Sequence, residues 1–164
     1  FNPPRYLRLL EVIPHTDSDP SFISFLMEFG DVILGKQTVL CKDTPGFIGN
    51  RIGVMCGIKS SQLTDKYKFK IEEVDLMTGS VIGLPNSGTF RLQDLVGLDT
   101  SNNVTNFLVN NVTNDSFYSK LKDETENKSF NFLIENKFFG NKSGKGYYEK
   151  TKEKFYIFYS DYFR

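Results

Sequence analysis

Apolar positions divide the chain into a first part with strand-like runs and a longer second part with helical spacing. The runs over 6–14 and 36–41 are typical of buried strands. Between them Asp19 and Pro20 suit a helix start, and apolar side chains then recur at the spacing of one helix face, at positions 22, 25, 26 and 29. A strand, a helix and a strand joined by short connections predict one parallel β-α-β unit, which is too small to form a domain by itself.

Beyond Asn50 the apolar spacing becomes that of helices. The pattern predicts helices over 50–67, from 70 to before Gly79 or Gly83, from 89 to Gly97, from 99 to about 112 and over 116–135. A loop over 83–89 is dense in Gly, Pro, Ser and Asn. This part therefore predicts an all-helical domain, and the aromatic run over 154–159 has the pattern of a strand.

The two parts meet in Lys42–Arg51, which reads K-D-T-P-G-F-I-G-N-R. Asp43 and Thr44 can cap a helix, and Pro45 suits its first position. Asn50 then stands among apolar neighbours, where an unpaired amide costs on the order of a few kcal/mol. It should hold either a backbone group or a ligand, and the residues alone leave both interpretations open.

One carboxylate interrupts the first predicted strand. Glu11 is flanked by Leu10 and Val12, so it either faces solvent or is a positioned charge with a function. Because carboxylates are seldom buried without a partner, a solvent-facing position is the simpler interpretation.

Composition and charge argue against several classes of protein. The chain has 20 basic and 20 acidic residues, so its net charge favours neither nucleic acid nor an anionic membrane as a partner. No apolar run is long enough to span a bilayer, and the first residues have no signal-peptide pattern. The single histidine, His15, follows a proline at a strand end, and the two cysteines lack metal-ligand spacing. We therefore expect a cytoplasmic protein with no metal, nucleic-acid or membrane site.

Several stretches, in the right order, resemble the 3-hydroxyacyl-CoA dehydrogenases of fatty-acid β-oxidation. They are F-N-P-P at 1–4, L-E-V-I at 10–13, K-D-T-P-G-F-I-G-N-R at 42–51, F-R-L-Q-D-L-V-G-L-D-T at 90–100 and G-K-G-Y-Y at 144–148. Any one stretch would be suggestive, but their order along most of the chain makes the resemblance specific.

The resemblance implies a mainly α fold in which a Rossmann piece precedes a helical domain. Residues 1–42 would be the C-terminal, β-α-β remnant of the NAD-binding domain, residues 43–150 the helical C-terminal dehydrogenase domain, and residues 151–164 an aromatic tail or connector. The implied reaction oxidises (S)-3-hydroxyacyl-CoA to 3-oxoacyl-CoA with NAD. Because no G-x-G-x-x-G occurs, we expect NAD to be bound by a missing N-terminal domain, with no cofactor-binding residue in this chain.

The resemblance also implies roles for individual residues. Glu11 matches the family's glutamate that orients a catalytic histidine, which would stand just before Phe1, and this replaces the solvent-facing interpretation. Asn50 matches an asparagine that touches the substrate, while Pro85 and Phe90 are expected to bind substrate at the acyl pocket. Without the histidine and the dinucleotide turn, the chain alone is expected to be inactive.

The expected partners are an acyl-CoA substrate and a second copy of the chain, bound through the helical domain as a dimer. Single-function members read G-P-F where this chain has Gly88, Thr89 and Phe90, which resembles multifunctional members fused to an enoyl-CoA hydratase. Two alternatives stay open. One is a helical oligomerisation module without activity, and the other is a related 3-hydroxy-acid or carnitine-type dehydrogenase.

Overall fold

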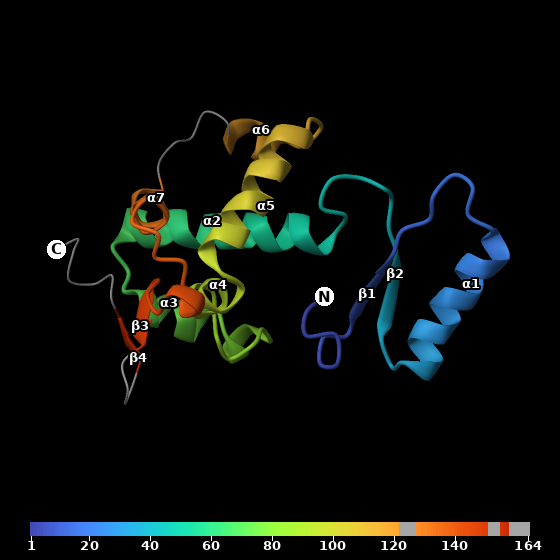
Figure 1. Cartoon of the computed structure of the whole chain (residues 1–164), viewed down its shortest axis with the longest axis horizontal. Coiled ribbons are helices and arrows are strands. Elements are labelled where there is room, and N and C mark those ends of the chain that lie inside the picture. The colour runs from blue at the N-terminus through green and yellow to red at the C-terminus, as the bar shows by residue number, and fades with distance from the viewer. Residues whose placement is uncertain (122–126, 151–154, 158–164) are drawn as a thin grey trace. The chain divides into compact units, whose positions relative to one another are not determined.

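The computed structural model of the chain describes residues 1–121, 127–150 and 155–157 (Figure 1). The chain forms two compact units, Phe1–Arg51 and Ile52–Arg164. In the described ranges no helix combines the length and the apolar character needed to cross a bilayer.

The first unit is the predicted β-α-β arrangement. Strand β1 (Leu9–Val12) leads to helix α1 (Pro20–Glu28), a π-helical turn η1 (Phe29–Ile33) and strand β2 (Gln37–Leu40). The two strands pair in parallel, with the first residue of β1 opposite the first residue of β2, and α1 runs alongside them in Figure 1. The parallel pairing confirms the prediction made from the short strand, helix and strand connections.

Local chemistry explains where α1 begins and how it meets the strands. Asp19 accepts a hydrogen bond from the Ser21 N–H at 2.8 Å, and Pro20 occupies the first turn. At the other end Gly30 is buried, and a Cβ there would lie 2.3 Å from Thr38 Cγ2 and 2.9 Å from Leu10 Cδ2. The absence of a side chain therefore lets the η1 backbone lie directly against both strands.

Little of the first unit is buried. Within residues 1–51 only Gly30 and Cys41 fall in the buried class. The outer face of α1 and η1 instead exposes large apolar side chains, namely Phe22, Phe25, Phe29, Val32, Ile33 and Leu34. Exposed apolar side chains gathered along one helical segment mark a surface suited to association.

The second unit is helical, as predicted. Helix α2 (Gly49–Tyr67) begins at the end of the first unit. The further elements are α3 (Ile71–Met77), η2 (Ser80–Ile82), α4 (Phe90–Val96), α5 (Leu98–Asn111), α6 (Ser116–Leu121), α7 (Lys128–Glu135), η3 (Asn141–Ser143), β3 (Tyr148–Lys150) and β4 (Phe155–Ile157). The first four predicted helices are confirmed to within a few residues.

Two clusters of buried side chains hold this unit together. The larger cluster joins α3, α4, α5 and α7 to the segment before β3, through Ile71, Val74, Phe90, Leu98, Leu133 and Tyr147. The smaller one joins α5 to α6 through Leu108, Val112 and Tyr118. The core therefore lies among the short helices, and the segment before β3 belongs to it.

The single long helix predicted over 116–135 is wrong. Asn127 has φ −123° and ψ 79°, which is outside the helical region, and its side chain accepts a hydrogen bond from Phe130 N–H at 3.2 Å. It also accepts one from Ser61 Oγ at 3.1 Å. Asn127 is thus a helix cap that starts α7, a role that its neighbours' apolar periodicity concealed.

The aromatic tail is described only in part. Phe155–Ile157 forms β4 and pairs in antiparallel fashion with β3, so a strand stands where the aromatic pattern predicted one. The rest of the predicted tail or connector, 151–154 and 158–164, lies outside the described residues.

Candidate active site

The carboxylate of Glu11 holds the start of helix α2. Its Oε1 accepts hydrogen bonds from the Ile48 N–H at 3.0 Å and from the Gly49 N–H at 2.7 Å. These N–H groups lie at a helix N-terminus, where a negative charge is stabilised by the helix dipole. Glu11 is therefore half-buried with two donors and does not simply face solvent.

The capping predicted for Asp43, Thr44 and Pro45 is wrong. The helix does not begin until Gly49, because the preceding turn passes through left-handed backbone at Gly46 (φ 74°) and Phe47 (φ 48°). Such residues cannot continue a right-handed helix. The cap comes instead from Glu11, 38 residues earlier than Gly49, and no local sequence rule could have found it.

Phe1 lies at the same place. A Cβ on Gly49 would stand 2.5 Å from Phe1 Cζ and 3.2 Å from Leu9 Cδ2, so the Phe1 ring packs directly on the first residue of α2. Because the N–H of Gly49 also bonds to Glu11, the first residue of the chain, the carboxylate and the helix start meet within the first unit. Both backbone amide bonds to Glu11 go to Oε1, so Oε2 has lone pairs for a further donor.

Asn50 is the second residue of α2, directly after Gly49. It is exposed, and its side chain makes no hydrogen bond with any residue that the structure describes. The structure therefore does not show the Asn50 carboxamide bound to a backbone group, which was one of its two interpretations. Its contact with substrate stays a prediction.

The other two predicted substrate residues, Pro85 and Phe90, belong to the second unit. Pro85 is exposed, and its carbonyl accepts from the Gly88 N–H at 3.0 Å. Phe90 is only 1% exposed and its ring centroid lies 4.6 Å from that of Tyr147. Its position is that of a core side chain, and its role in substrate binding stays a prediction without support from its position.

A pair of buried carboxylates in the second unit was not predicted from the sequence. Asp75 accepts from the Phe90 N–H at 2.6 Å, from the Arg91 N–H at 2.9 Å and from the Tyr148 hydroxyl at 2.7 Å. Asp75 therefore caps α4 from α3, and it also holds the side chain of a residue on β3. Asp and Glu are common in this sequence, so the sequence alone did not distinguish the two buried carboxylates from the others.

Asp94, on α4, performs the same task for the backbone before β3. Its two oxygens accept from the Tyr147 N–H at 3.0 Å and the Tyr148 N–H at 2.8 Å. A Cβ on Gly146 would lie 2.1 Å from Asp94 Oδ1, and one on Gly140 would lie 2.4 Å from the Asp94 carbonyl oxygen. The glycines of this stretch thus let the chain approach a carboxylate of its own, which is a structural role.

Burial is the largest influence on the pKa values of Asp94, Asp75 and Tyr148. It raises the pKa of Asp94 to about 6, against the opposing effect of the Tyr148 and Tyr147 amides. The pKa of Asp75 is raised for the same reason, although its hydrogen bond from Tyr148 works in the opposite direction. Burial and the contact with Asp75 raise the pKa of the Tyr148 phenol well above its usual range. Because the hydrogen-bond partners of both carboxylates are backbone amides and one phenol of the same unit, we assign the pair a structural role.

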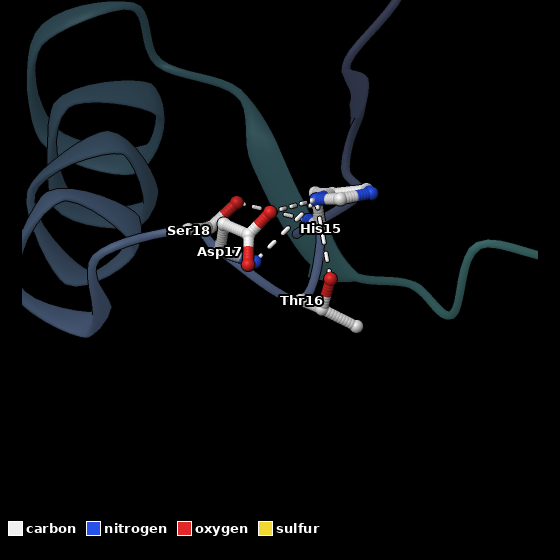
Figure 2. A network of polar contacts seen from close by, with 4 residues as sticks. All are labelled: His15, Thr16, Asp17 and Ser18. Carbon is white, nitrogen blue, oxygen red and sulfur yellow. Dashed lines mark hydrogen bonds and ion pairs between the residues drawn. The ribbon is translucent and has the colours of Figure 1, made fainter.

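His15, the one histidine of the sequence, lies in an exposed turn before α1. Figure 2 shows its ring beside Thr16 and Asp17; Nδ1 is 3.3 Å from Thr16 Oγ1 and 3.4 Å from Asp17 Oδ2. Its backbone N–H donates to Ser18 Oγ at 2.9 Å. These contacts are local to the turn, so His15 is an exposed turn residue.

The cysteines differ from one another. Cys41 is buried, and burial followed by the nearby Glu11 charge raises the pKa of its thiol, so it stays a protonated thiol at neutral pH. Cys56 is exposed. Within the described ranges, no group of three or more His, Cys, Asp or Glu side chains is placed to hold a metal ion.

Comparison with known proteins identifies both units. The family model described as the 3-hydroxyacyl-CoA dehydrogenase NAD-binding domain matches residues 1–44, and the model of the C-terminal domain of the same enzymes matches residues 46–150. A probable 3-hydroxyacyl-CoA dehydrogenase of Deinococcus radiodurans is 42% identical over 153 residues, covering 93% of this chain and 42% of that protein.

Two further similarities agree with this one. A probable 3-hydroxyacyl-CoA dehydrogenase of Bacillus subtilis is 41% identical over 157 residues, which are 95% of this chain and 19% of that protein. The crystal structure of 3-hydroxybutyryl-CoA dehydrogenase from Escherichia coli superposes with a TM-score of 0.73 at 26% identity, covering 94% of this chain and 31% of that one. The chain therefore spans less than half the length of these proteins.

The match over residues 1–44 corrects one prediction. We expected NAD to be bound wholly by a missing domain, whereas the chain itself carries part of the NAD-binding domain. The carboxyl ends of parallel strands are where such sheets bind their ligands, and Glu11 is the next-to-last residue of β1, close to that edge. The residues present fit this edge of a dinucleotide site, but the Gly-rich turn for the pyrophosphate is not among them.

Proposed function

Because this chain belongs to the 3-hydroxyacyl-CoA dehydrogenase family, we propose that it supplies the carboxylate of the catalytic pair and the substrate-side helical domain of an NAD-dependent enzyme. The proposed reaction oxidises (S)-3-hydroxyacyl-CoA to 3-oxoacyl-CoA in fatty-acid β-oxidation. The observation that carries the proposal is the meeting of Glu11, Phe1 and the start of α2 at one place.

Glu11 has the geometry of a residue that orients a base. Two backbone amides fix Oε1, so Oε2 can accept the far N–H of an imidazole carried by the residue before Phe1. A carboxylate in that position selects the tautomer whose other nitrogen takes the proton of the 3-hydroxyl, and it then stabilises the imidazolium that forms. NAD, when bound, accepts the hydride from C3.

Asn50 would hold the substrate at the same helix start. Its carboxamide is exposed in the first turn of α2, where an N–H donor and the helix dipole both favour an oxygen that gains negative charge. We propose that Asn50 donates to the acyl oxygen, and that Pro85 borders the acyl chain from the loop over 83–89.

The test is NADH-dependent reduction of acetoacetyl-CoA by the full-length protein. Glu11→Gln keeps an acceptor oxygen but removes the charge that stabilises the imidazolium, so kcat should fall by at least about 100-fold. Glu28→Gln, at an exposed position of α1, is the matched control and should keep the wild-type rate. Wild-type kcat in Glu11→Gln would refute the proposed role.

Residues 1–164 by themselves should give no turnover in this assay. The only histidine of this stretch is His15, in its exposed turn, and no pyrophosphate-binding turn is present. Measurable turnover by this stretch alone would contradict the proposed location of the base.

The helical unit also exposes an apolar surface that suits a second copy of the chain. The neighbouring elements α3, η2 and α4, with the loop directly after η2, carry large apolar side chains that are each more than half exposed, namely Leu76, Val81, Ile82, Leu84, Leu95 and Val96. Exposed apolar surface of this kind marks association sites. We propose that two chains pair through it.

A multifunctional parent is the second candidate. The chain covers only 19% of the Bacillus subtilis relative, so family members can carry this module within a much longer polypeptide. The open reading frame of the parent gene decides the question, and a hydratase domain beside the dehydrogenase domains is the expected finding.

A further inference from the structure

The side chain of Lys36 ties the connection before β2 to the segment before β1. Its Nζ donates to the carbonyl oxygens of Pro4 and, at 2.6 Å, of Leu7. The backbone N–H of Lys36 donates to the Gly30 carbonyl at 2.9 Å. This bond holds the Lys36 backbone against η1. One ammonium group therefore holds two carbonyls that lie about thirty residues earlier in the chain.

The segment that it holds is a tight turn. Pro3 O accepts from the N–H groups of Tyr6 and Leu7 at 3.1 and 3.2 Å, and the two carbonyls taken by Lys36 lie within or at the end of this turn. Lys36 is half-buried, and a partly desolvated ammonium is costly unless its donors are satisfied. The Lys36 contacts therefore select one geometry for the turn over others.

This geometry reaches Glu11. The turn leads back to Phe1, whose ring packs on Gly49, and the Gly49 N–H donates to Glu11 Oε1 at 2.7 Å. Phe1 is therefore held against the residue whose amide binds the Glu11 carboxylate. The path from Lys36 to Glu11 consists of contacts within the first unit alone.

We propose that Lys36 is a positioning residue for the dehydrogenase reaction: by holding the Pro4 and Leu7 carbonyls, it sets the distance between Glu11 and the imidazole that precedes Phe1. This inference rests on the proposed function, because it needs a base at that position. Lys36 itself touches neither substrate nor cofactor in this scheme. A purely structural lysine would change the stability of the fold, whereas a positioning lysine also changes kcat and the pH profile.

The kinetic arm uses the full-length protein with NADH and acetoacetyl-CoA. Lys36→Met keeps the length of the stem without the donors, and kcat per folded enzyme should fall about 10-fold or more while KM stays within about twofold. In this reductive direction the imidazolium donates the proton, so activity is lost as the pH rises through the imidazole pKa. The alkaline limb of kcat/KM should therefore move to lower pH, because an imidazole farther from a carboxylate has a lower pKa. Lys36→Arg again supplies N–H donors at this position and should bring the limb of the pH profile back to its wild-type position. The control Lys120→Met, at an exposed lysine of α6, should leave kcat and the pH profile unchanged.

The structural arm does not depend on activity. In residues 1–164 the nuclear Overhauser effect between the Phe1 ring and the Gly49 amide should be present in the wild type and lost in Lys36→Met. If the wild-type protein shows no turnover, the proposed function is overturned, and with it the catalytic part of this inference. The nuclear Overhauser measurement would still decide whether Lys36 places Phe1. A Lys36→Met enzyme with wild-type kcat and alkaline limb, or one that keeps the Phe1–Gly49 contact, would overturn the positioning role.

Discussion

Asp94 links one side chain to the pH dependence of the whole helical unit. The carboxyl is almost fully buried between α4 and the segment before β3, and it accepts hydrogen bonds from two backbone amides. Desolvation outweighs these hydrogen bonds and raises its pKa to about 6. The folded chain therefore binds this proton more tightly than the unfolded chain, in which the pKa is about 4.

The sign of the pH effect follows from this difference. The contribution of Asp94 to the free energy of unfolding is fully present below pH 4 or so and is lost as the pH rises through about 6, by up to about 3 kcal/mol. Asp75, whose pKa is also raised by burial, acts in the same direction.

We predict that Asp94→Asn flattens this dependence. Urea unfolding of residues 1–164 at several pH values between 4 and 7 measures it, as the difference in slope between wild type and variant. The asparagine amide also places an NH₂ against a backbone N–H, so the variant should be less stable by about 1–3 kcal/mol at pH 7. Equal slopes in the two proteins would show that Asp94 does not titrate in this range.

At the scale of elements, helix α2 shows what periodicity can and cannot predict. Its length was predicted from the apolar spacing and the lack of an interior proline, and the helix observed is Gly49–Tyr67. Its start at Gly49 lies within one residue of the predicted Asn50, but its cap was misassigned. The left-handed backbone at Gly46 and Phe47 separates the predicted caps from the helix, and the cap comes from Glu11 on another element. Local rules describe neighbours along the chain, whereas this cap depends on strand pairing.

Two glycines of α2 give a matched test. A Cβ on Gly49 would collide with Phe1 Cζ at 2.5 Å, while a Cβ on Gly53 would meet nothing within 4 Å. Gly53→Ala should therefore stabilise the chain by about 0.5–1 kcal/mol through helix propensity. Gly49→Ala should lose that gain and, in the full-length protein, lower kcat by displacing Phe1.

Thermal or urea unfolding of the two alanine variants measures the difference. Equal stabilisation by both substitutions would mean that the Phe1 ring does not pack on Gly49. The same result would weaken the placement of a catalytic base beside Glu11, because that placement runs through Phe1.

At the scale of the molecule, the resemblance of ordered motifs was more informative than any single residue. The β-α-β piece, the helical unit and the family were all predicted from the sequence, and the comparisons confirm the family. The buried pair Asp75 and Asp94 and the Lys36 contacts were not predicted. They join segments far apart in the chain, and their letters are common surface residues whose burial only folding decides.

The apolar surface over α3, η2 and α4 makes a prediction at this scale. Sedimentation of residues 1–164 should give a dimer of the 18.8 kDa chain. Val81→Glu combined with Leu95→Glu should give a monomer, because two buried carboxylates would face each partner. Asn103→Glu on the exposed side of α5 adds the same kind of charge and should leave the dimer intact. A wild-type monomer at micromolar concentration would refute the pairing.

The bond from the Tyr148 hydroxyl to Asp75 sets an alkaline limit for the helical unit. Because burial and the Asp75 charge raise the pKa of this phenol, its contribution to the free energy of unfolding is present below the ordinary tyrosine pKa of about 10 and is lost at higher pH. When Tyr148 ionises, a phenolate would face a carboxylate, so base should detach the start of β3 from α3.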